Sequence, residues 1–145
     1  MTLSRASALL AALWAGALLA VAGLAAPAAF AALPQAEAGR VVSRLLAAEA
    51  ATSLALGMLL LMIERRRARD AAEAGQGSQF SVGMMLALGA IFCTVVGYYA
   101  VLPHMTAART GQSALSFGQW HAVSLAFFGL KLLIVLSLAW RNTAR

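Results

Sequence analysis

Four long apolar segments dominate the sequence and limit what it can fold into. They cover residues 6–32, 45–63, 80–102 and 117–140, and short segments with most of the charged residues separate them. A helix of about 20 apolar residues crosses the hydrocarbon core of a bilayer, because each residue adds about 1.5 Å. We therefore expect an all-α fold, a four-helix transmembrane bundle that forms a single integral membrane domain over residues 1–145.

Charged side chains are too few to cover a water-soluble protein. They make up 11% of the 145 residues, whereas hydrophobic residues make up 62%, and a soluble domain carries about 25% charged residues. The net charge is +6, but the basic residues gather at the ends of the apolar segments, as topology signals do. We therefore predict the lipid bilayer as a partner and exclude nucleic acid.

The first apolar segment has two interpretations. Its basic start at Arg5, its apolar core and its ending Ala29-Phe30-Ala31 are typical of a cleaved secretory signal peptide. Its apolar run, however, is longer than the about 7–15 residues of a signal core. We expect the segment to be retained as the first span, and cleavage remains the alternative.

Small residues recur on one face of the first and third segments. In the first segment this face holds Ala12, Gly16, Ala20, Gly23 and Pro27, and in the third it holds Gly89, Cys93 and Gly97. Small residues let two helix backbones approach closely. We expect the first and third helices to pack through these faces, and Pro103 to end the third helix.

Arginine clusters predict the orientation in the membrane. The segment after the second span holds Arg65, Arg66, Arg67 and Arg69. With that segment inside, seven arginines lie on the cytoplasmic side, since Arg5, Arg141 and Arg145 join these four, and three lie outside, namely Arg40, Arg44 and Arg109. The positive-inside rule then places both termini in the cytoplasm. We expect a multi-pass protein of a bacterial inner membrane.

The last apolar segment carries polar residues inside a stretch that is long enough to cross the bilayer. At 100° per residue, His121, Ser124 and Lys131 fall within an arc of about 80° on one helix face. Ionisable residues within a span are costly in lipid and mark ligand or ion sites. We therefore take His121, Ser124 and Lys131 as the candidate polar or ligand site, against the simpler interpretation that each is only satisfied inside the bundle.

Lys131 needs a partner at its own depth. It lies about 15 Å beyond His121 along the helix, which puts it far from either membrane surface. Glu49 is a candidate charge partner, but it lies only about 6 Å inside a second span that begins near Leu45. The depths of Lys131 and Glu49 are therefore expected to differ, which leaves a carbonyl, a hydroxyl such as Ser124 or Thr94, water or a bound anion to contact Lys131.

Three sequence pieces together resemble a known family. They are Leu13-Trp14-Ala15-Gly16, Ala26-Pro27-Ala28-Ala29-Phe30 and Phe117-Gly118-Gln119-Trp120-His121-Ala122-Val123-Ser124. Their order and spacing resemble the four-helix membrane proteins of domain-of-unknown-function family 4149, which is related to eukaryotic transmembrane protein 205. The family typically reads Leu-His-Gly-x-Ser in the last helix, so His121 and Ser124 match whereas Trp120 and Ala122 depart from it. The resemblance also implies a retained first helix.

A more distant resemblance bears on cofactors. The early Trp-x-Gly followed by Pro and an aromatic residue is similar to CopD-type copper-resistance proteins and bacterial haem-dependent protoporphyrinogen oxidases. That resemblance implies haem or copper held by membrane histidines, and here His121 is the one candidate ligand. The first helix of this chain lacks the histidine that such proteins generally have.

These features favour a non-enzymatic membrane protein. The chain has no glycine-rich phosphate loop, no Ser/His/Asp set and no paired intramembrane carboxylates. We therefore predict no catalytic residue and no cofactor, and a bundle that acts as an assembly partner or as a small-molecule or ion carrier. Because no broken helices are expected, a carrier would need a second copy of the chain. The alternative is a haem- or copper-handling redox protein that uses His121.

Overall fold

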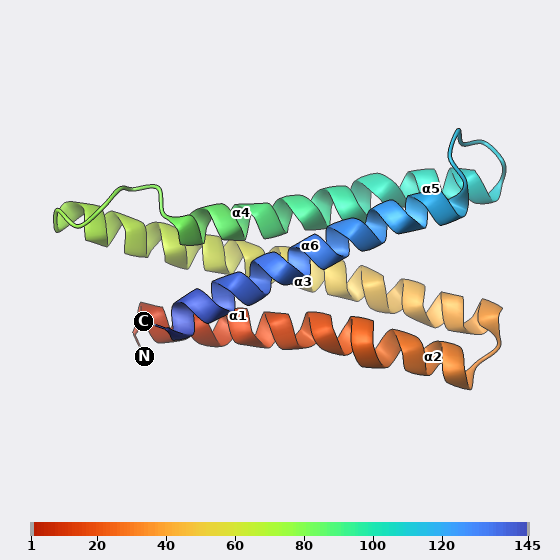
Figure 1. Ribbon diagram of the computed structural model, residues 1–145, viewed down its shortest axis with the longest axis horizontal. Coiled ribbons are helices and arrows are strands. Elements are labelled where there is room, and N and C mark those ends of the chain that lie inside the picture. The colour runs from red at the N-terminus through yellow and green to blue at the C-terminus, as the bar shows by residue number, and fades with distance from the viewer. Residues whose placement is uncertain (1, 145) are drawn as a thin grey trace.

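The computed structural model describes residues 2–144, which form four helical spans (Figure 1). The first span consists of α1 (Leu3–Ala20), the π-helical segment η1 (Val21–Ala25) and α2 (Ala26–Ala32), and the second is α3 (Gln35–Glu73). The third consists of α4 (Val82–Thr94), the π-helical segment η2 (Val95–Ala100) and α5 (Val101–Arg109), and the fourth is α6 (Phe117–Thr143). The predicted all-α four-helix fold is confirmed.

Local capping residues set the helix starts. The side chains of Thr2, Ser81 and Ser116 accept hydrogen bonds from the backbone amides of Arg5, Met84 and Gln119, which satisfies donors that have no partner inside their helices. Ser116 and Gln119 form a reciprocal capping box at the start of α6. Pro34 is the N-cap residue of α3, which begins at Gln35, and only Leu33 and Pro34 separate this helix from the end of the first span at Ala32. The connections are therefore short, and each span runs antiparallel to the one before it.

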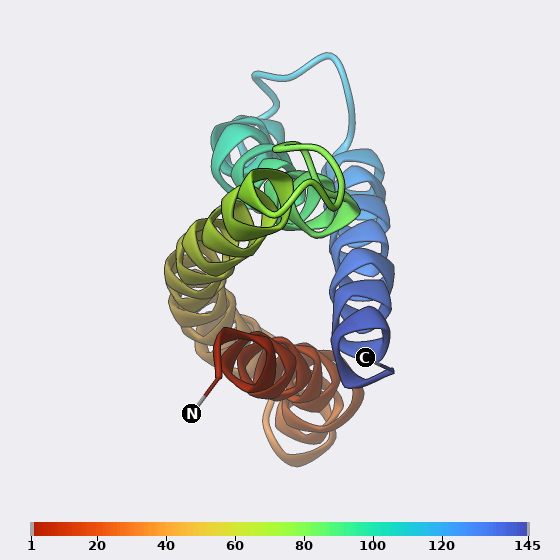
Figure 2. The same ribbon diagram turned by 90° about the vertical axis from the view of Figure 1, so that its left-hand side faces the viewer.

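The four spans surround the core in chain order (Figure 2). α1 packs against α3 and α6, and α4 likewise packs against α3 and α6, so the first and third spans lie diagonally opposite each other. Both termini lie at one end of the bundle, here called the terminal end (Figure 1). The loop between α3 and α4 lies at the same end, and the other two connections lie at the opposite end.

The expected packing of the first helix against the third through small-residue faces is wrong for α1. Gly16, Gly23 and Pro27 are exposed, and no atom lies within 4 Å of a Cβ built on either glycine. The buried residues of α1 are Ser7, Ala11, Trp14, Ala15 and Leu18. These buried residues lie on a face of the helix roughly 150° away from the small-residue face. Trp14 is the large side chain that fills the core, so the small-residue face points outward.

The glycines of the third span contact α6 instead. A Cβ on Gly97 would overlap Phe127 Cβ, and one on Gly89 would lie 3.4 Å from Ile134 Cδ1. Ser124 also donates a 2.8 Å hydrogen bond to the carbonyl oxygen of Gly97. η2 and α6 therefore cross closely at Gly97.

This crossing gives a prediction that compares two glycines. Gly97→Ala should lower the free energy of unfolding by about 1–3 kcal/mol, because the added methyl overlaps Phe127 and the helices must separate. Gly16→Ala is the matched control, and it should be neutral or stabilise the protein by up to about 1 kcal/mol, because alanine is a better helix former. Thermal unfolding in detergent measures both, and equal effects would contradict the assigned crossing.

Each π-helical segment comes just before a proline. η1 ends two residues before Pro27, and η2 ends three residues before Pro103. A proline ring normally clashes with the carbonyl four residues earlier, and a π-helical turn changes the position of that carbonyl. The third span consequently continues through Pro103 to Arg109. The prediction that Pro103 ends the helix is therefore wrong, whereas each span remains one continuous helix through its π-helical turn.

The chain thus consists of two hairpins of the same design. Each has a helix, a π-helical segment and a short helix with a proline, followed by a connection and a long uninterrupted helix. The two hairpins diverge toward the end opposite the termini, where α5 and the start of α6 lie apart from α2 and the start of α3 (Figure 1). The bundle is therefore closed at the terminal end and splayed at the other.

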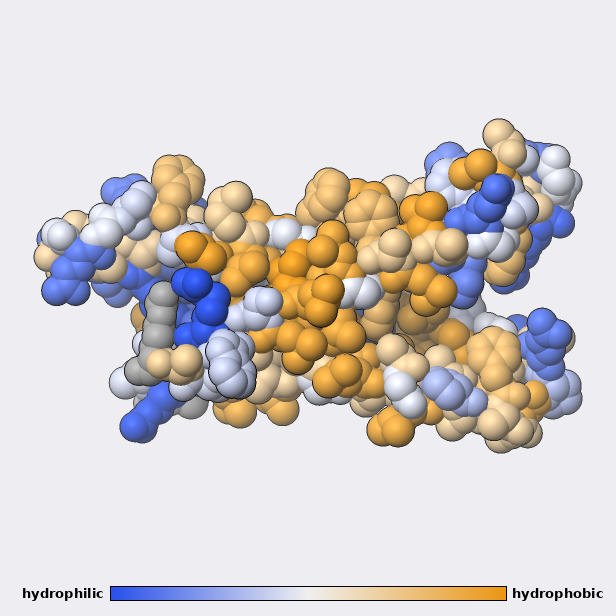
Figure 3. Space-filling model, in the orientation of Figure 1, coloured by the Kyte–Doolittle hydropathy of each residue, from blue (hydrophilic) through white to orange (hydrophobic). Residues whose placement is uncertain are grey.

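The surface matches a protein that crosses a bilayer. A wide hydrophobic band covers the middle of the visible face, and hydrophilic residues gather at both ends (Figure 3). Many large apolar side chains point outward, among them Leu24, Met62, Phe92 and Leu133. Within the described residues, four helices are long and apolar enough to span a membrane. The chain is a multi-pass membrane protein.

Candidate functional site

A buried ion pair lies between the two hairpins. Lys131 Nζ of α6 donates a 2.6 Å hydrogen bond to Glu49 Oε1 of α3, and the residues are only 3% and 9% exposed. The ammonium group also lies 4.9 Å from the centre of the Phe128 ring, within range of a cation–π interaction. Because the opposite charges are in direct contact, neither is left uncompensated in the apolar interior.

Two further side chains extend this pair across the bundle. Ser53 Oγ donates to Glu49 Oε1, and Trp14 Nε1 of α1 donates a 2.8 Å bond to Ser53 Oγ. Lys131 Nζ lies 3.5 Å from the same Ser53 oxygen. We call Trp14, Glu49, Ser53 and Lys131 the polar core. Among the described residues, every hydrogen bond to the Glu49 carboxylate goes to Oε1, which leaves Oε2 free to accept another donor.

Glu49 and Lys131 lie at the same depth, contrary to the expectation from a span that begins near Leu45. α3 begins at Gln35 and α6 begins at Phe117, and both starts lie at the splayed end. Each charged residue comes 14 positions after the start of its helix, which is about 21 Å along the axis. A mismatch in depth is expected only for a helix that begins near Leu45, whereas α3 begins ten residues earlier, at Gln35.

Two spaces of different character adjoin the polar core. A small cavity of about 30 Å³ lies between α3, the third span and α6, and its walls include Glu49, Thr94, Tyr98, Ser124 and Lys131. It is large enough to hold a water molecule among polar partners. A larger crevice of about 220 Å³ lies between the first span and α3 and includes Glu49 and Ser53 in its wall. Glu49 thus borders both spaces, whereas Lys131 borders only the small cavity.

The three candidate residues of α6 do not form one site. Lys131 is buried in the polar core, and Ser124 bonds the Gly97 carbonyl and lines the small cavity. His121 is exposed and stacks on Phe117, with ring centres 6.0 Å apart. Near its start, α6 packs mainly against α5, because the two hairpins diverge there. His121 lies in this part of α6 and points outward, away from the other two residues of the predicted polar face.

Groups that could hold a metal are few in this arrangement. His104 stacks on Trp120 with ring centres 4.5 Å apart, and it lies on α5. Between residues 2 and 144, no three His, Cys, Asp or Glu side chains come close enough together to bind one metal ion. Cys93 is buried and lines the small cavity beside Lys131. The polar core is therefore the strongest candidate for a functional site.

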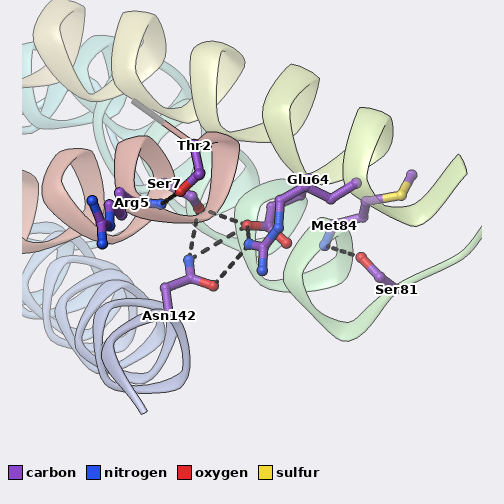
Figure 4. A network of polar contacts seen from close by, with 8 residues as sticks. Thr2, Arg5, Ser7, Glu64, Ser81, Met84 and Asn142 are labelled. Atoms are coloured by element: carbon purple, nitrogen blue, oxygen red, sulfur yellow. Dashed lines mark hydrogen bonds and ion pairs between the residues drawn. The ribbon is translucent and has the colours of Figure 1, made fainter. Parts of the chain in front are cut away.

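A second polar network joins the helices at the terminal end, and the sequence did not predict it. Ser7 of α1, Glu64 of α3 and Asn142 of α6 converge there (Figure 4). Glu64 Oε1 accepts 2.6 Å hydrogen bonds from both Ser7 Oγ and Arg67 Nη1. Asn142 Nδ2 donates to Ser7 Oγ at 2.7 Å, and Asn142 Oδ1 accepts from Arg67 Nη1 at 3.1 Å. We call these four residues the terminal clasp.

The fourth helix also contributes to the terminal clasp. A Cβ on Gly83 of α4 would overlap Glu64 Oε2, so the carboxylate rests against the first turn of that helix. The positive end of a helix dipole favours a carboxylate at this position. The clasp thus holds all four spans together at the terminal end, whereas the polar core lies beside the splayed half.

The polar core can bind a small polar group. The small cavity beside its carboxylate and ammonium groups can hold a water molecule. The free Oε2 of Glu49 can accept a hydrogen bond from a ligand. The terminal clasp joins side chains of α1, α3 and α6 by direct hydrogen bonds.

Comparison with known proteins identifies a family for this chain. The family model described as Domain of unknown function (DUF4149) matches residues 9–114, which include Trp14, Glu49 and Ser53 and end before α6. No curated protein and no solved structure matches the chain.

Proposed function

We propose that this chain, which belongs to the domain-of-unknown-function family DUF4149, is a membrane carrier that moves a small ion or molecule in exchange for protons at the polar core. The observation that carries the proposal is the contact between Glu49 and Lys131 in the interior of the bundle. Ionisable residues at such a depth are expensive in lipid and mark ion paths and proton relays.

The placement of the pair supports a carrier more than a purely structural role. Glu49 and Lys131 occupy corresponding positions of the two hairpins, 14 residues into each long helix. Carriers built from two repeats hold their sites near the membrane midplane, where the repeats meet. A buried ion pair is also weak support for stability alone, because apolar residues of similar volume stabilise a core as well or better.

Proton flux in vesicles tests the proposal. The purified protein is reconstituted in liposomes with a trapped pH dye, and a gradient of Na⁺, K⁺ or tetramethylammonium across the membrane drives protons in the opposite direction. We expect a flux that falls to the level of protein-free liposomes in Glu49→Gln. Asp70→Asn is the control, because Asp70 forms an exposed pair with Arg66 and should leave the flux unchanged. Equal flux in the wild type, both variants and empty liposomes would instead favour an assembly partner.

The orientation of this carrier is part of the proposal. Both termini lie at one end of the bundle together with Arg65, Arg66, Arg67 and Arg69, and Arg145 lies outside the described residues. The arginine excess at this end supports a cytoplasmic location for both termini in a bacterial plasma membrane.

Cysteine labelling checks the orientation. A membrane-impermeant thiol reagent added to whole cells should label Ser113→Cys at the splayed end and leave Ser78→Cys unlabelled until the cells are lysed. The buried Cys93 provides the background in the parent protein. Labelling of Ser78→Cys in intact cells would reverse the orientation.

A second copy of the chain remains a predicted partner. The outward face of the first span, with Gly16, Gly23 and Pro27, is where another helix would approach most closely. The polar core lies within one chain, however, so the proposed exchange site does not require the second copy.

A further inference from the structure

The larger crevice beside the polar core differs from the matching place in the other hairpin. In the second hairpin, Gly97 of η2 lies directly against Phe127 of α6, which closes the space between the two helices. In the first hairpin, η1 and α3 leave a crevice of about 220 Å³ that includes Val21 and Leu45 in its wall. The first hairpin is therefore open where the second hairpin is filled by a side chain.

The crevice is apolar except at one wall. Its apolar side chains come from Trp14, Leu18, Val21 and Leu45, and its polar wall comes from Glu49, Thr52 and Ser53 of α3. No basic residue lines it within the described part of the chain. Glu49 carries the one charge in this wall and has a free Oε2. A ligand head group that enters the crevice therefore meets hydrogen-bond acceptors and a negative charge.

Resting on the carrier function proposed above, we infer that the crevice between α1, η1 and α3 binds a small lipophilic ammonium ion, whose charged group contacts Glu49. The apolar walls would take the body of the ligand, and the exposed wall residues Ala17, Ala48 and Thr52 leave the crevice open to the lipid. An apolar cavity of about 150 Å³ binds benzene, so this crevice fits a ligand of one aromatic ring with a short aminoalkyl chain.

Charge balance couples the ammonium ion to a proton. Before binding, the carboxylate of Glu49 and the ammonium of Lys131 sum to zero. A ligand cation adds one positive charge, which is removed when Lys131 releases one proton to water in the small cavity and becomes a neutral amine. The charge of the core is then zero again, and one proton has left for each ligand bound.

The surroundings of Lys131 suit this exchange. Glu49 is the charged group that contacts it from α3, and Cys93 of α4 and Tyr98 of η2 are the titratable groups in the cavity wall from the third span. From α1, the neutral Trp14 indole reaches it only through Ser53. Among the described residues, Glu49 is the one acid that contacts Lys131 and also lines the crevice. Its carboxylate can therefore bind either Lys131 or a ligand in the crevice.

Binding of three matched probes tests the inference on the wild-type protein. Phenethylamine, 3-phenylpropionate and propylbenzene share one ring and a short chain but are cationic, anionic and neutral at pH 7. In weakly buffered detergent solution, phenethylamine should change the tryptophan fluorescence through Trp14 and release about one proton for each molecule bound. The other two probes should release none, and 3-phenylpropionate should not bind.

Two variants sharpen the test. Glu49→Gln should lose phenethylamine binding, whereas Glu37→Gln, an exposed acid on the same helix, should bind as the wild type does. Lys131→Arg keeps the positive charge but cannot release its proton, so it too should lose binding. Normal binding by Lys131→Arg, or equal binding of the anionic probe, would overturn the inference. Flux that depends on Glu49 without phenethylamine binding would overturn this ligand class and leave the proposed carrier function standing.

Discussion

Lys131→Met should destabilise the protein by about 3–5 kcal/mol, because it leaves the Glu49 carboxylate buried without its counter-ion. Glu49 is 9% exposed and receives only the Ser53 hydroxyl as a second donor. Methionine has nearly the volume of the lysine stem, so the loss reflects the missing charge and not a cavity. Equilibrium unfolding by a denaturing detergent measures the difference.

The double variant Lys131→Met/Glu49→Gln should recover more than half of that loss. Glutamine still accepts the Ser53 hydrogen bond, and no unpaired charge remains. Asp70→Asn provides the surface control and should change stability by less than about 1 kcal/mol, because both side chains of the Arg66–Asp70 pair are at least half exposed. A double variant as unstable as Lys131→Met would show that the ion pair is not the reason for the loss.

Glu64→Ala should cost about 2–4 kcal/mol, because the carboxylate accepts hydrogen bonds from Ser7, Arg67 and Asn142 at once. Arg67 is partly exposed and can turn to water, which limits the loss. The terminal end should also loosen, so amide hydrogen exchange should rise in the last turns of α6 and in the first turns of α1.

A substitution at an exposed acid shows whether the loss of stability comes from the terminal clasp or from removing any negative charge. Glu73 lies at the end of the same helix and is exposed, so Glu73→Ala should leave stability nearly unchanged. If Glu73→Ala and Glu64→Ala have the same effect, the clasp does not hold the terminal end together.

The fold could be predicted from the sequence because the apolar segments are long and the charges are few. Helix periodicity also showed that Lys131 faces inward, which the structure places in the core. The capping residue Ser116 and the proline at position 34 mark helix starts by local chemistry alone. Most features that depend on one helix are therefore accessible from the sequence, but the continuation of the third span through Pro103 is not, because it depends on the π-helical turn before the proline.

Features that depend on how helices meet were less accessible. The small-residue face of α1 suggested a packing surface, yet Trp14 fills the core from the other side. The partner of Lys131 could have been found by counting from Pro34 instead of Leu45, since Glu49 and Lys131 then have equal depths. Ser53 follows Glu49 by four residues and so shares its face, which was an available signal. The convergence of Ser7, Glu64 and Asn142 requires the three-dimensional arrangement.

Proton flux through the double variant Lys131→Met/Glu49→Gln tests the central claim most directly, because this variant should be folded and yet lacks both charged groups. Reconstituted at the same density as the wild type, it should be more stable than Lys131→Met and show a flux no greater than that of protein-free liposomes. A double variant that conducts protons as well as the wild type would contradict the assignment of the Glu49–Lys131 pair as the exchange site.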